Sequence, residues 1–204
     1  MLSSEFIITS LIVILIPGTG VIYTISMGLL QGWKASIYAA LGCTMGIVPH
    51  LLATVLGLAT ILYMSSVAFV IIKFIGVVYL LYLAWSMWRD TGVLKLDEKE
   101  SNLNSWNIVV KGFLINILNP KLSLFFLAFL PQFVPLQSQT PTLNMFILSI
   151  IFMLMTLFIF IIYGLFANSM RSYMLESPKI LKKIQQSFAL FFAALGVKLA
   201  MTDR

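Results

Sequence analysis

Long runs of apolar residues, separated by short polar stretches, occupy the chain from end to end. A helix needs about 20 mostly apolar residues to cross the hydrocarbon core of a bilayer. By that measure the sequence predicts six spans, near residues 4–27, 35–62, 67–88, 108–131, 142–168 and 184–201. Five spans are the alternative if either terminal segment is re-entrant. The pattern therefore predicts an all-α integral membrane protein.

Two of the predicted spans are interrupted by proline. Pro17 lies in the sequence IPGTG of the first span, and Pro120 lies in the sequence NPK of the fourth. Proline inside a helix removes one backbone hydrogen bond and presses its ring against an earlier carbonyl. In hydrocarbon the freed polar groups must face protein or a water-filled cavity. Paired interrupted segments indicate the substrate site of a transporter.

The two breaks divide the chain into similar halves. Each break lies in the first span of a set of three, and a three-span unit inserts its second copy upside down. We therefore predict six transmembrane helices as two inverted three-helix repeats, with spans one and four broken at proline. A single transporter domain would cover residues 1–204, with a first half at 1–90, a cytoplasmic loop at 91–107 and a second half at 108–204.

Composition supports the membrane class and excludes others. The 204 residues are 60% hydrophobic and 10% charged, with a mean hydropathy of +1.02. Soluble domains carry roughly 25% charged residues. The net charge of +6 comes without clustered basic residues and exposed aromatics, so we expect no nucleic-acid partner. The single cysteine, Cys43, excludes an intramolecular disulfide and a multi-cysteine metal site, and we expect no metal and no cofactor.

The basic residues predict the orientation. In the predicted topology, nine of the thirteen lysines and arginines fall on the side that holds the polar loops 89–107 and 169–183, and two fall on the other side. Lysine and arginine are enriched on the cytoplasmic side of membrane proteins. We therefore expect both termini outside.

The first break offers backbone donors. Gly18, Thr19 and Gly20 follow Pro17, and this composition should unwind the helix or kink it sharply. The amides that begin the resumed helix form a positive dipole end, which suits an anion. Thr19 adds a hydroxyl group. The alternative is a packing kink that binds nothing.

The second break carries a charge. Asn116, Asn119, Pro120 and Lys121 lie together, and Lys121 falls near the centre of its predicted span. A lone charge there costs at least ~2.5–3.5 kcal/mol. All seven acidic residues lie in loops or near span ends, so a substrate carboxylate is the predicted partner of Lys121. Snorkelling, or pairing with carbonyls freed at Pro120, is the alternative.

Three residues of the second span have separate interpretations. His50 is the only histidine and the candidate for proton coupling, because histidine ordinarily titrates near neutral pH. The alternative is a packing histidine beside Pro49. Gly42 and Gly46 form a GxxxG pair that lets helices approach closely. We interpret this pair as packing within the chain, with a homodimer contact as the alternative.

Taken together, these features resemble the LysE/RhtB family of bacterial amino-acid exporters, of the threonine, homoserine and lysine efflux type. The Pro-Gly break, Gly42, Gly46 and His50 match, as do the segments GLLQGWKAS, GVVYLLYLAW and NILNPKLSLFFLAFLPQFV. After Pro-Gly, this chain has Thr19 and Gly20 where the family usually has proline and then an acidic or amide residue. The resemblance implies efflux of small amino acids across the bacterial inner (plasma) membrane, driven by the proton gradient. The missing acid implies neutral substrates.

The sequence therefore predicts a secondary transporter whose partners are a small amino acid, protons and the lipid bilayer. The predicted substrate-binding residues are Pro17, Gly18, Thr19, Gly20, Asn116, Asn119, Pro120 and Lys121. A membrane hydrolase or redox carrier is disfavoured, because His50 has no buried acid and Cys43 has no second cysteine. A non-transporting membrane assembly subunit is the remaining alternative.

Overall fold

The computed structural model describes residues 3–16, 18–63, 102–134 and 138–167, with scattered helical positions between 74 and 89 and between 183 and 201. Within these residues the secondary structure is helical, and no strand occurs. The predicted third and sixth spans, at 67–88 and 184–201, lie largely outside the described residues. Pro17 and most of the predicted loop 91–107 lie outside them too.

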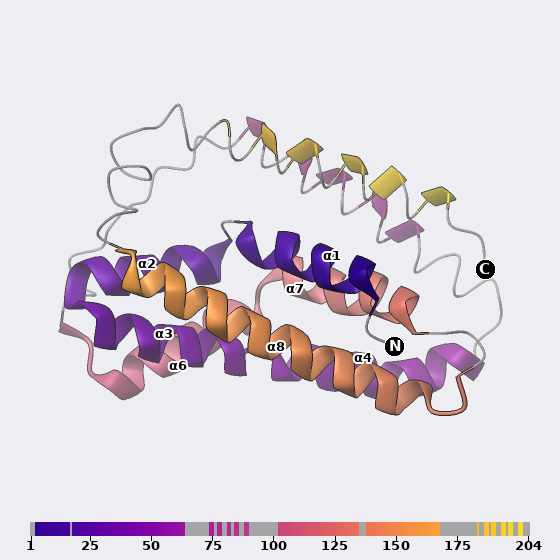
Figure 1. Cartoon of the computed structure of the whole chain (residues 1–204), viewed down its shortest axis with the longest axis horizontal. Coiled ribbons are helices and arrows are strands. Elements are labelled where there is room, and N and C mark those ends of the chain that lie inside the picture. The colour runs from indigo at the N-terminus through magenta and orange to yellow at the C-terminus, as the bar shows by residue number, and fades with distance from the viewer. Residues whose placement is uncertain are drawn as a thin grey trace.

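The helices run roughly along the long axis of the molecule (Figure 1). The first part of the chain forms α1 (Ser4–Leu15), α2 (Thr19–Gln31), α3 (Trp33–Met45) and α4 (Val48–Tyr63). The second part forms α6 (Ser105–Ile117), α7 (Pro120–Leu124), the π-helical turn η2 (Phe125–Phe129), the 3-10 turn η3 (Leu130–Phe133) and α8 (Pro141–Leu165).

The lengths of these helices fit a membrane. Trp33–Gly57 and Pro141–Leu165 are 25 residues each and apolar enough to cross a bilayer. Two bent pairs pass the same test if each pair is one span: α1 with α2, at 54°, and α6 with Lys121–Phe133, at 57°. These segments correspond to the predicted first, second, fourth and fifth spans. The described residues thus hold two to four candidate spans.

The outer face of α8 exposes large apolar side chains. Leu154 and Phe158 are 61% and 65% exposed, whereas Phe152, Thr156 and Phe160 are buried on the opposite face. A soluble protein rarely exposes a continuous apolar face of this kind. Lipid tails cover such a surface without cost, so the chain is an integral membrane protein.

Glycines bring α3 and α6 close together. A Cβ atom on Gly46 would lie 2.7 Å from the carbonyl oxygen of Phe113, and one on Gly42 would meet the backbone of Val109. From the other side, a Cβ on Gly112 would lie 3.0 Å from the carbonyl oxygen of Ala39. Small residues permit this approach of two backbones. Gly42 and Gly46 thus pack against α6 of the same chain, and a contact between two copies of the chain would need another surface.

Local signals end one helix and begin the next at each bend. The last backbone bond of the first helix runs from Ile16 N to Ile12 O, at 3.1 Å, and α2 begins after Gly18. At the second bend the side chain of Asn119 caps α7 by accepting a hydrogen bond from Lys121 N, at 3.1 Å. Pro120 is the first residue of α7, where its missing N–H costs nothing within that helix.

Candidate functional site

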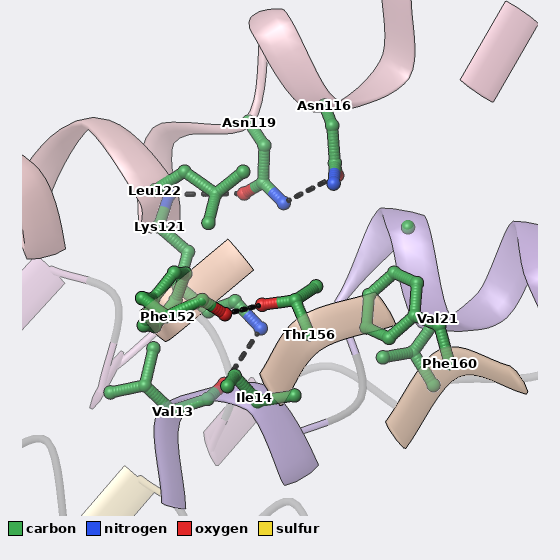
Figure 2. Close-up of a pocket in the computed structure, with 11 residues that line it drawn as sticks. Val13, Ile14, Val21, Asn116, Asn119, Lys121, Leu122, Phe152, Thr156 and Phe160 are labelled. Carbon is green, nitrogen blue, oxygen red and sulfur yellow. Dashed lines mark hydrogen bonds between the residues drawn. The ribbon is translucent and has the colours of Figure 1, made fainter. Parts of the chain in front are cut away.

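A small pocket lies where the two bends and α8 meet (Figure 2). The α1 and α2 side contributes Val13, Ile14, Gly20 and Val21, and the α6 and α7 side contributes Asn116, Asn119, Lys121 and Leu122. The third wall is α8, with Phe152, Thr156 and Phe160. The pocket has room for about one water molecule. Residues that are about 100 positions apart in the chain thus line one space.

The ammonium group of Lys121 binds the end of α1. Its Nζ donates to the carbonyl oxygens of Val13, at 3.0 Å, and of Ile16, at 3.1 Å. The carbonyl of Val13 is four residues before Pro17, which has no N–H to offer it. Tyr163 of α8 donates in the same way to the carbonyl of Leu15, at 3.0 Å. Side chains from the second half of the chain therefore satisfy carbonyls that the first break leaves open.

The second break shows the reverse arrangement. Pro120 cannot donate to the carbonyl of Asn116, four residues earlier, and Nε2 of His50 lies 3.0 Å from that oxygen. The backbone N–H of Asn119 donates to the same oxygen, at 3.0 Å. His50 belongs to α4, in the first half of the chain. Each half thus supplies a side chain that binds the carbonyl exposed by the proline of the other half.

Side-chain amides connect the second break to α3. Asn119 Nδ2 donates to Asn116 Oδ1 at 3.2 Å, and Asn116 Nδ2 donates to the carbonyl oxygen of Cys43 at 2.8 Å. The carbonyl of Cys43 is open because the N–H of Ile47 turns to Thr44 instead, where α3 gives way to α4. These bonds assign the nitrogen and oxygen positions of both side-chain amides.

His50 has partners on both ring nitrogens. Because the carbonyl of Asn116 can only accept, Nε2 carries a hydrogen. Nδ1 lies 3.4 Å from the hydroxyl oxygen of Ser123. A hydroxyl can donate to a neutral imidazole or accept from a charged one. The ring can therefore take up a proton at Nδ1 and keep both contacts.

The predicted site residues do not all reach the pocket. Gly20, Asn116, Asn119 and Lys121 line it, and a Cβ on Gly18 would lie 3.1 Å from Nζ of Lys121. The side chain of Thr19 is exposed and does not line the pocket. His50 lies behind Asn116 and contacts its backbone. The side chain of Pro120 lies outside the described residues. The carbonyls that bind Lys121 come from the first break, not from the second as the alternative prediction had it.

The α8 wall was absent from the sequence-based site. Phe152, Thr156 and Phe160 are spaced by four residues, which places them on one face of a helix. Asn144, Ser149 and Gly164 of the same helix are buried with them. This periodic set of polar and small residues is the signal that could have marked the inward face of α8.

Comparisons with known proteins agree with this architecture. The family model described as LysE type translocator matches residues 11–203. An uncharacterized membrane protein of Vibrio cholerae is 30% identical over 96% of this chain and 94% of its own length. A homoserine/homoserine lactone efflux protein of Salmonella typhimurium is 26% identical over the same shares of the two chains. A leucine efflux protein of Klebsiella pneumoniae is 24% identical over 96% of this chain and 92% of its own length.

No solved structure matches the chain. The family match nevertheless covers every residue that lines the pocket, from Val13 to Phe160. The chain therefore belongs to the LysE type translocator family, whose members are membrane transporters and not enzymes.

Proposed function

We propose that this protein exports small, neutral amino acids across the bacterial inner membrane, as a secondary transporter that exchanges its substrate for protons. Relatives named for the efflux of homoserine, homoserine lactone and leucine support an amino-acid substrate. The observation that carries the proposal is the ammonium group of Lys121, which lies on a pocket between two bent helix pairs.

The carboxylate of an amino acid fits the groups around Lys121. An ammonium group has three N–H donors, and the carbonyls of Val13 and Ile16 accept two of them. The third can meet a carboxylate oxygen. The first amides of α2, at Thr19, Gly20 and Val21, have no partners within their own helix, and they form its positive dipole end. The substrate carboxylate would therefore bind between Lys121 and the start of α2.

The surroundings of the pocket favour a neutral side chain. Glu5 is the one acidic residue among the described positions, and its side chain is exposed. It lies eight residues before Val13 in α1, which places it roughly 12 Å along the helix from that lining residue. A second positive charge on the substrate would find no carboxylate partner in the described walls. The oxygen of the Asn116 side chain, beside Gly20, would accept a hydrogen bond from the amino group of the substrate.

Transport requires the pocket to open, since it now holds about one water molecule. We infer a six-span protein in which two inverted three-helix halves rock against each other around this point. The reciprocal contacts support this symmetry, because each half binds the carbonyl freed by the proline of the other. Both termini would lie outside. A homodimer would not use Gly42 and Gly46, which pack within the chain.

His50 is our proposed coupling residue. Both hydrogen-bond contacts of His50 are compatible with a neutral or a charged imidazole ring. One of these contacts is with the backbone carbonyl of Asn116, whose side chain lines the pocket. Protonation would place a charge beside the second break. This charge would weaken the binding of a substrate ammonium there and favour its release, as exchange of substrate for protons requires.

Counterflow in liposomes tests the function. The purified protein is reconstituted into vesicles loaded with unlabelled leucine or homoserine, which are diluted into a trace of the labelled amino acid. We expect a transient accumulation of label, which protein-free vesicles do not show. A membrane assembly subunit would exchange nothing, so the absence of label for a broad panel of amino acids would overturn the proposal. An imposed pH gradient should then accelerate efflux if protons are the coupling ion.

A further inference from the structure

The pocket is lined by polar side chains from the second break and by a mainly apolar wall from α8. Asn116, Asn119 and Lys121 bring the polar groups, whereas α8 contributes two phenylalanine rings with a threonine between them (Figure 2). An amino acid has the same division, with its charged groups at one end and its variable side chain at the other. If the charged groups bind at Lys121, the side chain is directed toward the wall that α8 provides.

The two rings of this wall are held very differently. Phe152 stacks on Phe125 with ring centroids 4.3 Å apart and meets the edge of Phe126 at 5.5 Å. Phe160 makes no ring contact within the described part of the chain. It rests against Gly20, where a Cβ atom would come within 3.1 Å of its ring. Phe152 is therefore held by other rings, whereas Phe160 is buried with no ring of the described residues against it.

Thr156 adds one polar group to this wall. Its hydroxyl donates to the carbonyl oxygen of Phe152, at 2.8 Å, so the hydrogen of the hydroxyl is already used. The lone pairs of the hydroxyl oxygen can still accept a hydrogen bond. A substrate hydroxyl directed at this wall would donate to Thr156, and an aliphatic side chain of the same shape would not.

We propose that Phe160 and Thr156 select the side chain of the transported amino acid. Phe160 sets how large that side chain can be, and Thr156 favours a side chain that bears a hydroxyl group over an aliphatic one of the same shape. This inference rests on the proposed function, because it specifies the substrate of the same pocket.

The test compares ratios of transport rates between amino acids in the counterflow assay. Phe160→Ala should raise the rate for phenylalanine relative to alanine by about tenfold or more, since differences of a few methylene groups in an apolar pocket are discriminated by at least that factor. Thr156→Val should lower the rate for threonine relative to valine several-fold, because these two substrates have nearly the same shape. Phe158→Ala is the matched control: Phe158 lies on the same helix, is 65% exposed, and should leave both ratios unchanged.

The outcomes separate this inference from the function itself. If the variants of Phe160 and Thr156 slowed all amino acids by the same factor, the residues would be structural and the inference would be wrong. If the wild type moved no amino acid, the proposed function would be wrong and the inference with it. Phe160→Leu serves if Phe160→Ala does not accumulate in the membrane; it removes the ring but keeps an apolar side chain, and an unchanged phenylalanine to alanine ratio would again overturn the inference.

Discussion

The ammonium nitrogen of Lys121 donates a hydrogen bond to the carbonyl oxygen of Val13, 3.0 Å away and 108 residues earlier in the chain. That carbonyl is open because Pro17, four residues later, has no N–H. One lysine thus neutralises the negative end of α1 and at the same time lines the pocket. A substrate carboxylate would bind the third N–H of the ammonium group, beside the two carbonyls that it already holds.

Lys121→Ala should abolish transport while the protein still inserts into the membrane. Truncation of one member of a buried charge pair costs about 2–5 kcal/mol, which corresponds to roughly 30-fold to several thousand-fold in affinity. Counterflow activity and the amount of protein in the membrane would be measured together. Lys34→Ala is a control at an exposed lysine, for which we expect normal activity.

Tyr163→Phe separates the two roles of Lys121. The lysine variant removes the side-chain donor of the Val13 and Ile16 carbonyls. Tyr163→Phe likewise removes the side-chain donor of the Leu15 carbonyl, but it removes no charge from the pocket. We expect the variant to lose about 1–3 kcal/mol of stability, the usual cost of an unpaired buried polar group. Thermal unfolding in detergent would report this loss, and counterflow should persist. Loss of transport in Tyr163→Phe equal to that in Lys121→Ala would show that the α1 carbonyls matter and the charge does not.

Gly20→Ala should damage the pocket directly. The added Cβ would lie 2.6 Å from Oδ1 of Asn116 and 3.1 Å from the ring of Phe160, so both side chains must move. Overpacking of this kind typically costs about 1–3 kcal/mol, and we expect transport to fall with it. Gly57→Ala in α4 is the matched control, since a Cβ there meets nothing within 4 Å. Helix propensity alone should leave that variant as stable as the wild type or up to about 1 kcal/mol more stable. Equal effects at both glycines would contradict the close packing at Gly20.

The position of Lys121 could be predicted from the sequence, but its partners could not. Its place near the centre of a span marked it as costly, and the nearby Asn119 and Pro120 marked a break. Pro17 shows that the carbonyl of Val13 is open, but the sequence does not show that Lys121 reaches it, because that depends on how α1 meets α7 in space. Hydropathy predicts where helices lie, but it does not predict which helix ends meet.

Thr19 and the α8 wall show two other limits of the sequence. Thr19 was included because it adjoins the first break, yet helix geometry points its side chain away from the pocket, while Gly20 and Val21 face it. Successive residues of a helix are rotated by about 100° around its axis, so Thr19 can point away from a pocket that Gly20 and Val21 line. Phe152 and Phe160 lie in a span so uniformly apolar that only the periodic small and polar residues distinguish its inner face.

Asn119→Asp should weaken substrate binding, because the new carboxylate would compete with the substrate for Lys121. Nζ of Lys121 and Nδ2 of Asn119 lie 3.1 and 4.0 Å from the same point beside Gly18, so a carboxylate at position 119 would lie near the ammonium group and attract it. Aspartate also keeps the cap of α7, so its first turn should remain intact. We expect the apparent KM for amino acids to rise about tenfold or more. Asn119→Ser keeps a capping oxygen without the charge, and a similar KM in the two variants would argue against a carboxylate site at Lys121.

His50→Gln should separate exchange from proton-driven efflux. A glutamine side chain can still donate to the carbonyl of Asn116, as Nε2 of His50 now does, but it cannot take up a proton. Counterflow, which needs no net proton movement, should therefore continue, whereas efflux driven by an imposed pH gradient should fall to the rate seen without the gradient. Ser123→Ala, which removes the partner of Nδ1 but leaves the imidazole, should reduce gradient-driven efflux less than His50→Gln does. If His50→Gln lowered counterflow and gradient-driven efflux by the same factor, His50 would only support the backbone at the second break, and protons would enter by another group.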